Sequence, residues 1–436
     1  MQIPTIKFTY ADRSIELEEL MLWVLKPLFV LFIYFAIFGR NVIILGVGGG
    51  LASVLIGFAI FVLTAGHFLF YREEQKVSQL TFLVILFFIL IAVKPFLSYL
   101  IYDVRPNQIL RYAIEVGINF GMLFATYYLI RNKIITPKFF LYALGIMGLV
   151  VSVQLMINLV GMTVVRRVTG LRGALNYTAS ALAMCSVVWA LIIYSLNHDR
   201  ENKSNKLYKT LAVTALVLVM FGVIITGSRS AMLSFVIGLF LLQILGMKSK
   251  KFTRYVLIFT TLLAFLIAYI AMKVDLSLLL NRFALAELSR MAFIRFDIYW
   301  RAIADLTIVE FMFGRADLYT FDDSLIEAGR TVNTHNIFLS FIRYNGVFAL
   351  TVFLLILYSI FANYKQLYLK HKFKPKLRLT ECSIIVLLTM AIIYSMFSGG
   401  RTTRIFFIFI YLGYAIGYLE MLRTVKSEEE YKKLIL

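Results

Sequence analysis

The chain has 436 residues, of which 61% are hydrophobic and only 16% are charged, and its formal net charge is +20. Soluble domains carry about a quarter charged residues, so this composition argues against a soluble domain and indicates a membrane protein. The net positive charge does not indicate a nucleic-acid partner, because much of it follows the orientation of the predicted membrane helices.

Twelve apolar runs approach the roughly 20 residues that a helix needs to cross the hydrocarbon core of a bilayer. They are numbered here as spans one to twelve and cover residues 20–39, 42–64, 79–102, 109–130, 139–162, 176–196, 209–226, 230–247, 255–273, 335–361, 380–397 and 401–421. The sequence therefore predicts an all-α, polytopic integral membrane protein that forms one domain over residues 1–436. The connections are short except for residues 274–334, and a long insertion of this kind is usually functional.

Lysine and arginine are divided between alternate connections. The loops after spans two, four, six, eight and ten, together with the C-terminal tail, hold 17 Lys and 6 Arg and form the Lys-rich side. The alternate loops and the helix ends beside them hold 16 Arg and 2 Lys and form the Arg-rich side. Because short Lys-rich loops stay in the cytoplasm, both termini are expected there and residues 274–334 are expected outside. The outer arginines run against the positive-inside trend, which indicates a function.

Three helices of the Arg-rich side start in a similar way. Spans six, eight and twelve begin near Arg172, Arg229 and Arg401, each beside a glycine and a side chain that can cap a helix. Free amides at a helix N-terminus attract anions, and a neighbouring guanidinium adds charge and paired donors. A membrane-bound anion that faces outward, such as a lipid diphosphate, fits this pattern best. The alternative is that these arginines only reach toward lipid head groups, although lysine would serve that purpose equally well.

Residues 290–309 are predicted to form an amphipathic helix that lies on the membrane or on the helical bundle. Most of its charged residues share one face, but Arg295 falls on the apolar face. A charge on a packing face needs an anionic partner. That partner is either a substrate or a nearby carboxylate, Asp275 or Glu287.

His335 is the histidine best placed for chemistry, because it lies where residues 274–334 enter span ten. Thr334 or Asn333 is expected to cap that helix, which would place His335 in its first turn. The helix dipole there favours a neutral imidazole, which is a competent general base; the alternative is a capping hydrogen bond.

Other titratable residues compete with His335 or are set aside. Three carboxylates of the same outer segment are rival bases, namely Asp322, Asp323 and Glu327. The remaining histidines are expected to be solvated or interfacial, namely His67, His198 and His371. The two cysteines, Cys185 and Cys382, are not expected to pair.

Three segments resemble the bacterial O-antigen polymerase and O-antigen ligase family of membrane glycosyltransferases. They are GSRSA at 227–231, RFDIYWRAIADLTIVEFMFGRAD at 295–317 and THNIFLSFIRYNGV at 334–347. The resemblance implies an enzyme that needs neither metal nor cofactor and uses glycans linked to undecaprenyl diphosphate at the outer face of the cytoplasmic (inner) membrane. It also implies that Arg229 and Arg295 bind diphosphate and that His335 is catalytic. Arg343 and Asn345 stand where many relatives have an acidic and a small residue, which indicates a different acceptor.

The expected function is therefore a polysaccharide polymerase for O-antigen, capsule or exopolysaccharide. Arg229, Arg295, Arg172 and Arg401 would hold the donor diphosphate, and His335 would deprotonate a hydroxyl of a lipid-linked repeat unit. One alternative is a ligase that transfers the finished polymer to lipid A-core or to protein. Another is a polysaccharide flippase, which predicts two similar halves and no long loop on one side. The expected partners are the lipid-linked glycans, membrane lipid and a chain-length regulator protein.

Overall fold

The structure is a computed structural model. It describes residues 7–10, 13–35, 43–44, 47–70, 78–102, 106–159, 175–198, 205–245, 299–300, 303–304, 306–314, 326–327, 330–331, 336–370, 375–398 and 406–425. Span nine, residues 255–273, lies outside the described residues, as does most of the outer segment 274–334.

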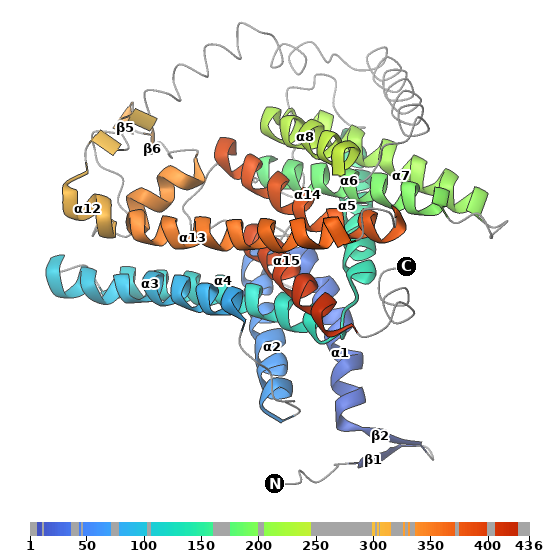
Figure 1. Ribbon diagram of the computed structural model, residues 1–436, viewed down its shortest axis with the longest axis horizontal. Helices are drawn as coiled ribbons and strands as arrows, with labels where there is room; N and C mark the ends of the chain where they lie inside the picture. The colour runs from blue at the N-terminus through green and yellow to red at the C-terminus, as the bar shows by residue number, and fades with distance from the viewer. Residues whose placement is uncertain are drawn as a thin grey trace, which may run out of the picture.

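Long helices make up most of the described chain (Figure 1). They are α1 (Leu17–Ile33), α2 (Gly49–Phe70), α3 (Gln79–Tyr102), α4 (Pro106–Arg131), α5 (Pro137–Leu159), α6 (Leu175–His198), α7 (Asn205–Ile225), α8 (Arg229–Leu245), α12 (Ile308–Phe313), α13 (Ile337–Lys370), α14 (Pro375–Ser398) and α15 (Phe406–Thr424). Three small antiparallel hairpins accompany them: β1 (Lys7–Tyr10) with β2 (Arg13–Glu16), β3 (Ile43–Ile44) with β4 (Val47–Gly48), and β5 (Ile326–Glu327) with β6 (Arg330–Thr331).

The all-α class is confirmed for the described part of the chain, where the only strands are those of the hairpins. Among the described residues, five helical stretches are long and apolar enough to cross a membrane: Tyr112–Arg131, Pro137–Leu159, Thr178–Leu196, Leu207–Ile225 and Ile337–Lys370. Five shorter apolar helical stretches accompany them. The composition and these helices together identify a membrane protein.

The start of span two differs from the prediction. The sequence predicts a helix from residue 42, but the chain forms the hairpin β3–β4 there and α2 begins at Gly49. The reason is the glycine-rich run GVGGG at 46–50, because glycine loses much conformational freedom in a helix and favours turns.

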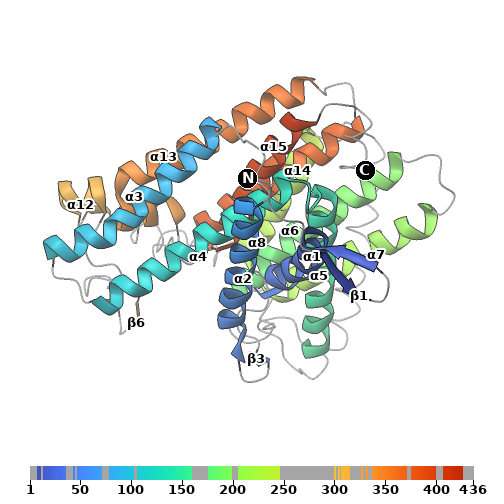
Figure 2. The same ribbon diagram turned by 90° about the horizontal axis from the view of Figure 1, so that it is seen from below.

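The helices form two neighbouring groups (Figures 1 and 2). In one group α3 lies between α4 and α13, and α2 and α15 pack on α4. In the other group α6 contacts α5, α7, α8 and α14. Contacts of α14 with α13 and α15 join the two groups. The core lies along α6, α14 and α15, whose described side chains are almost all buried.

Helices α4 and α15 pack with their backbones in contact and run in the same direction. A Cβ on Gly413 would lie 2.6 Å from the carbonyl oxygen of Leu123, and a Cβ on Gly417 would lie 2.7 Å from that of Tyr127. Small residues spaced by four allow this close approach between membrane helices. Since the later glycine meets the later residue of α4, the C-terminal ends of both helices lie together.

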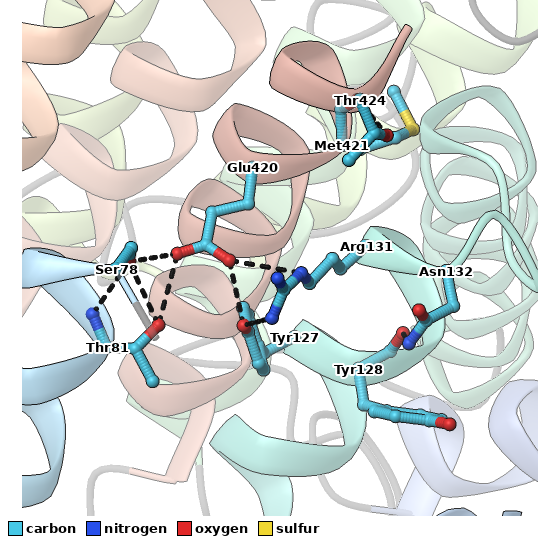
Figure 3. A network of polar contacts seen from close by, with 9 residues as sticks. All are labelled: Ser78, Thr81, Tyr127, Tyr128, Arg131, Asn132, Glu420, Met421 and Thr424. Carbon is cyan, nitrogen blue, oxygen red and sulfur yellow. Dashed lines mark hydrogen bonds and ion pairs between the residues drawn. The ribbon is translucent and has the colours of Figure 1, made fainter. Parts of the chain in front are cut away.

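A buried polar network joins these two helix ends to the start of α3 (Figure 3). The Glu420 carboxylate accepts hydrogen bonds from Tyr127 at 2.8 Å and Thr81 at 3.1 Å, and it also accepts one from Ser78. It forms an ion pair with Arg131 at 3.2 Å between Nε and Oε2. A buried ion pair stabilises a fold only when further hydrogen bonds satisfy its polar atoms, and this one has them.

His67 also lies at this end of the bundle, and its predicted exposure was wrong. Its side chain is only 7% exposed, and its Nδ1 lies 2.7 Å from the hydroxyl of Tyr128. The reason is that α2 packs along α4, which covers the end of α2 that the sequence places at the membrane surface.

Candidate functional site

The candidate site is built around the N-terminal third of α13. Asn336 caps this helix, because its Oδ1 accepts hydrogen bonds from the backbone N–H groups of Phe338 at 2.9 Å and Leu339 at 3.3 Å. Its carbonyl oxygen accepts the first bond of the helix from Ser340 N at 2.9 Å. The sequence thus sets the start of the helix with an asparagine that satisfies two otherwise unpaired amides.

This cap differs from the predicted one. The sequence analysis placed Thr334 or Asn333 at the cap and His335 in the first turn, whereas α13 begins at Ile337. His335 therefore comes directly before the cap residue in the sequence, and it lies outside the described residues.

Nine residues after its start at Ile337, α13 is kinked at Gly346, where φ is 77° and ψ is 168°. The short helix α12 packs against this kink. A Cβ on Gly346 would lie 2.2 Å from the carbonyl oxygen of Met312, and a Cβ on Gly314 would lie 2.6 Å from that of Tyr344. Only glycine fits both the positive φ and the backbone contact. The contact brings together two of the three segments that carry the family resemblance.

The sequence of α12 explains why it is a separate helix. Thr307 Oγ1 accepts from the backbone N–H of Glu310 at 3.2 Å, and the Glu310 carboxylate accepts from the backbone N–H of Thr307 at 2.9 Å. This capping box starts a new helix at Ile308, so the predicted amphipathic helix does not run unbroken to Val309. Gly314, with φ of 84°, ends α12 by donating to the Glu310 carbonyl oxygen at 2.7 Å.

A buried cluster around Lys94, here called the cationic cluster, lies beside the kink and draws on three helices: Lys94 of α3, Tyr112 of α4, and Tyr344 and Asn345 of α13. Arg343 of α13 is fully buried and Lys94 of α3 is 6% exposed. Lys94 Nζ lies 6.0 Å from the ring centroids of both Tyr112 and Tyr344. The Tyr112 hydroxyl donates to Asn345 Oδ1 at 2.7 Å, which ties α4 to α13. Ionisable side chains within membrane helices are costly and commonly mark substrate or ion sites, so this cluster is a functional candidate.

Lys94 and Tyr112 were not predicted from the sequence as site residues. Both lie in apolar spans whose partners only the fold reveals. One signal was available, since Lys94 is one of the 2 lysines on the Arg-rich side. Of the two departures from the family pattern, Asn345 lies in this cluster, and Arg343 is fully buried two residues before it in α13.

The GSRSA segment forms the tight turn that its glycine predicts. Gly227 has φ of 62° and its N–H donates to the carbonyl oxygen of Ile224 at 2.9 Å. The carbonyl oxygen of Ser228 accepts from Met232 N at 3.1 Å, so α8 begins at Arg229. Arg229 is thus the first residue of a helix, as predicted, although its side chain is not among those described.

The other predicted site residues lie outside the described part of the chain. They are Arg172, Arg295, His335 and Arg401. The rival bases Asp322 and Asp323 also lie outside it, and Glu327 is placed in β5 by its backbone alone. Among the described residues, the structure brings together α12 and the kink of α13, through the contact between Gly314 and Gly346.

Comparisons with known proteins add no assignment, because no family model and no curated protein matches the chain.

Proposed function

We propose that the protein is a polysaccharide polymerase of the bacterial inner membrane. It is an inverting glycosyltransferase that moves a glycan from undecaprenyl diphosphate to a lipid-linked repeat unit. The observation that carries this proposal is the contact between Gly314 of α12 and the kink of α13 at Gly346. It joins residues 306–314 of one segment that carries the resemblance to residues 336–347 of another, beside the cationic cluster.

The proposed topology has twelve membrane spans, both termini in the cytoplasm and the site outside. This topology is supported by the places of the Glu420 network and of the cationic cluster along α3 and α4. The Glu420 network joins the start of α3 to the end of α4, on the Lys-rich side. The cationic cluster instead uses Lys94 in the second half of α3 and Tyr112 near the start of α4. The two clusters thus lie toward opposite ends of the bundle, and the cationic one lies toward the Arg-rich side.

In the proposed chemistry, His335 accepts the proton of the acceptor and the arginines stabilise the negative charge of the leaving group. His335 takes the proton of an acceptor hydroxyl, and the oxygen attacks the anomeric carbon opposite the diphosphate. The new glycosidic bond forms as the bond from the anomeric carbon to the diphosphate oxygen breaks, and undecaprenyl diphosphate leaves with the electron pair. Arg229, Arg295, Arg172 and Arg401 stabilise that leaving group, because fixed cations act where negative charge develops.

The exposed apolar residues of the outer segment support a position of this segment at the lipid surface. Trp300 is 69% exposed, and Ile308 and Phe313 of α12 are 85% and 56% exposed. Large apolar side chains on a short helix of this kind bury themselves at the membrane interface. In that position α12 would guide a lipid-linked substrate toward the start of α13.

The test is a reconstitution with defined substrates. Purified protein in liposomes receives lipid-linked repeat units, and the products are separated by size. A polymerase gives a ladder that extends one repeat unit at a time. Addition of one finished chain to lipid A-core would identify a ligase, and movement of the lipid-linked glycan across the bilayer without bond formation would identify a flippase.

A further inference from the structure

A second region of the molecule carries a feature that the polymerase proposal does not use. Helices α5, α6 and α7 enclose an open apolar groove of about 640 Å³. Its lining includes Tyr142 and Ile146 of α5, Trp189 and Leu196 of α6, and Tyr208 and Leu211 of α7. The volume falls within the roughly 300–1,000 Å³ that is typical of small-molecule sites.

The groove opens toward lipid. All three of its helices contain stretches that are long and apolar enough to cross a membrane. Residues at its rim project outward, since Ile146 is 47% exposed and Leu211 is 56% exposed. An apolar groove between membrane helices is filled by hydrocarbon chains, because water has no favourable partners there.

The floor of the groove is fixed in place. The Trp189 ring is 9% exposed and its Nε1 donates a hydrogen bond to the carbonyl oxygen of Gly145 at 3.0 Å. Gly145 lets the ring lie against α5, because a Cβ there would stand 3.3 Å from Trp189 Cε2. A fixed aromatic floor favours binding, since little side-chain freedom is lost when a ligand enters.

A lysine lies beyond one end of the groove, on the same face of α5 as the groove residues. Lys138 is exposed and lies at the start of α5, four residues before Tyr142 and eight before Ile146. These spacings put the three side chains on one helix face, with the lysine one turn beyond the groove. Lys209, near the start of α7, belongs to the same Lys-rich side. Basic residues at the end of a pocket between membrane helices recognise anionic lipid head groups.

We propose that this groove binds an anionic glycerophospholipid from the leaflet on the Lys-rich side. One acyl chain lies over Trp189 between Ile146 and Leu211, and the lipid phosphate pairs with Lys138. The aromatic rings of Tyr142 and Tyr208 lie near the head-group level, where such rings are favoured. This site is separate from the Arg-rich face and does not depend on the proposed polymerase reaction.

The test is photo-crosslinking to the purified full-length protein in nanodiscs. The probes are phosphatidylglycerol and phosphatidylcholine that carry the same diazirine-labelled acyl chain, and labelled peptides are mapped. The phosphatidylglycerol probe is expected to label α5 and α7 about fivefold more strongly, because a lysine near the surface contributes about 1 kcal/mol toward an anionic lipid. Lys138→Gln should remove this preference without removing labelling.

Two variants fill the groove from its exposed rim, Ile146→Trp and Leu211→Trp, and both should abolish labelling of α5 and α7. The matched control is Val236→Trp on α8, which is 57% exposed and is not among the groove residues, and it should label like the unmodified protein. Equal labelling by the two probes, or unchanged labelling in both groove variants, would overturn the proposal. Stronger labelling by a polyprenyl phosphate probe would also overturn it, because the site would then belong to a substrate lipid.

Discussion

Gly314 and Gly346 hold the end of α12 against the kink of α13. Both have positive φ, 84° and 77°, and the space where a Cβ would stand at either one is filled by backbone of the other helix. The contact therefore fixes how segment 306–314 meets segment 336–346. In the proposed enzyme, this arrangement sets the position of α12 relative to the first part of α13, which Asn336 caps.

The first prediction concerns this contact. Gly346→Ala should destabilise the protein by about 1–3 kcal/mol or more, because it combines an unfavourable φ with a clash against Met312. The melting temperature in detergent should fall and polymer synthesis should be lost. The matched control is Gly117→Ala in α4, where nothing lies within 4 Å of the added Cβ and helix propensity improves by about 0.5–1 kcal/mol. Equal stability of the two variants would contradict the close contact.

The second prediction concerns the Glu420 network. Glu420→Ala leaves Arg131 and three hydroxyl groups without their shared acceptor, and removing one partner of a buried ion pair typically costs about 3–5 kcal/mol. The thermal stability of this variant should fall, and the loss should be smaller in the double variant with Arg131→Ala than the sum of the two single losses. Arg423→Ala serves as control, since its hydrogen bond to Asn363 is exposed. Additive losses would show that the two charges are not coupled.

The third prediction tests the sidedness of the membrane topology. Cys185 and Cys382 are both buried, so they should react slowly with a membrane-impermeant maleimide. A cysteine introduced at Asp323 should be labelled in intact cells, whereas one at Lys374 should be labelled only after the membrane is opened. The reverse pattern would place the Arg-rich side in the cytoplasm and remove the basis for an outer site.

The fourth prediction separates diphosphate binding from contact with lipid head groups. A planar guanidinium can make two parallel hydrogen bonds to a phosphate, which an ammonium group cannot reproduce. Arg229→Lys and Arg295→Lys should therefore weaken binding of the lipid-linked donor and cripple polymerisation. Lys370→Ala, on the Lys-rich side, should have no effect. Full activity in both lysine variants would show that only a cation at the membrane surface is required.

The sequence predicted the bounds of some apolar helices well because their signal is local. Span three coincides with α3, and span eight differs from α8 by one residue at its start and two at its end. Each helix follows an apolar run, and residues that favour turns mark its ends in the sequence, as Gly227 does before α8. Local signals also misled at the start of α13, since Asn336 rather than Thr334 or Asn333 caps it.

The polar clusters could not be predicted, because their members come together only through helix packing. Glu420 and Ser78 are 342 residues apart in the sequence. Tyr112 and Asn345 likewise meet only because α4 and α13 both lie beside α3. Nothing in the sequence around His67 indicates that Tyr128 covers it.

The most direct test of the proposed function is polymer synthesis by purified protein with His335 intact or replaced. The unmodified protein, given lipid-linked repeat units in liposomes, should produce a ladder of polymer and release undecaprenyl diphosphate. His335→Ala should fold and bind the donor normally but polymerise about 10²–10⁴-fold more slowly, as expected for loss of a general base. A ladder of normal length and rate from His335→Ala, or no ladder from the unmodified protein, would contradict the proposal.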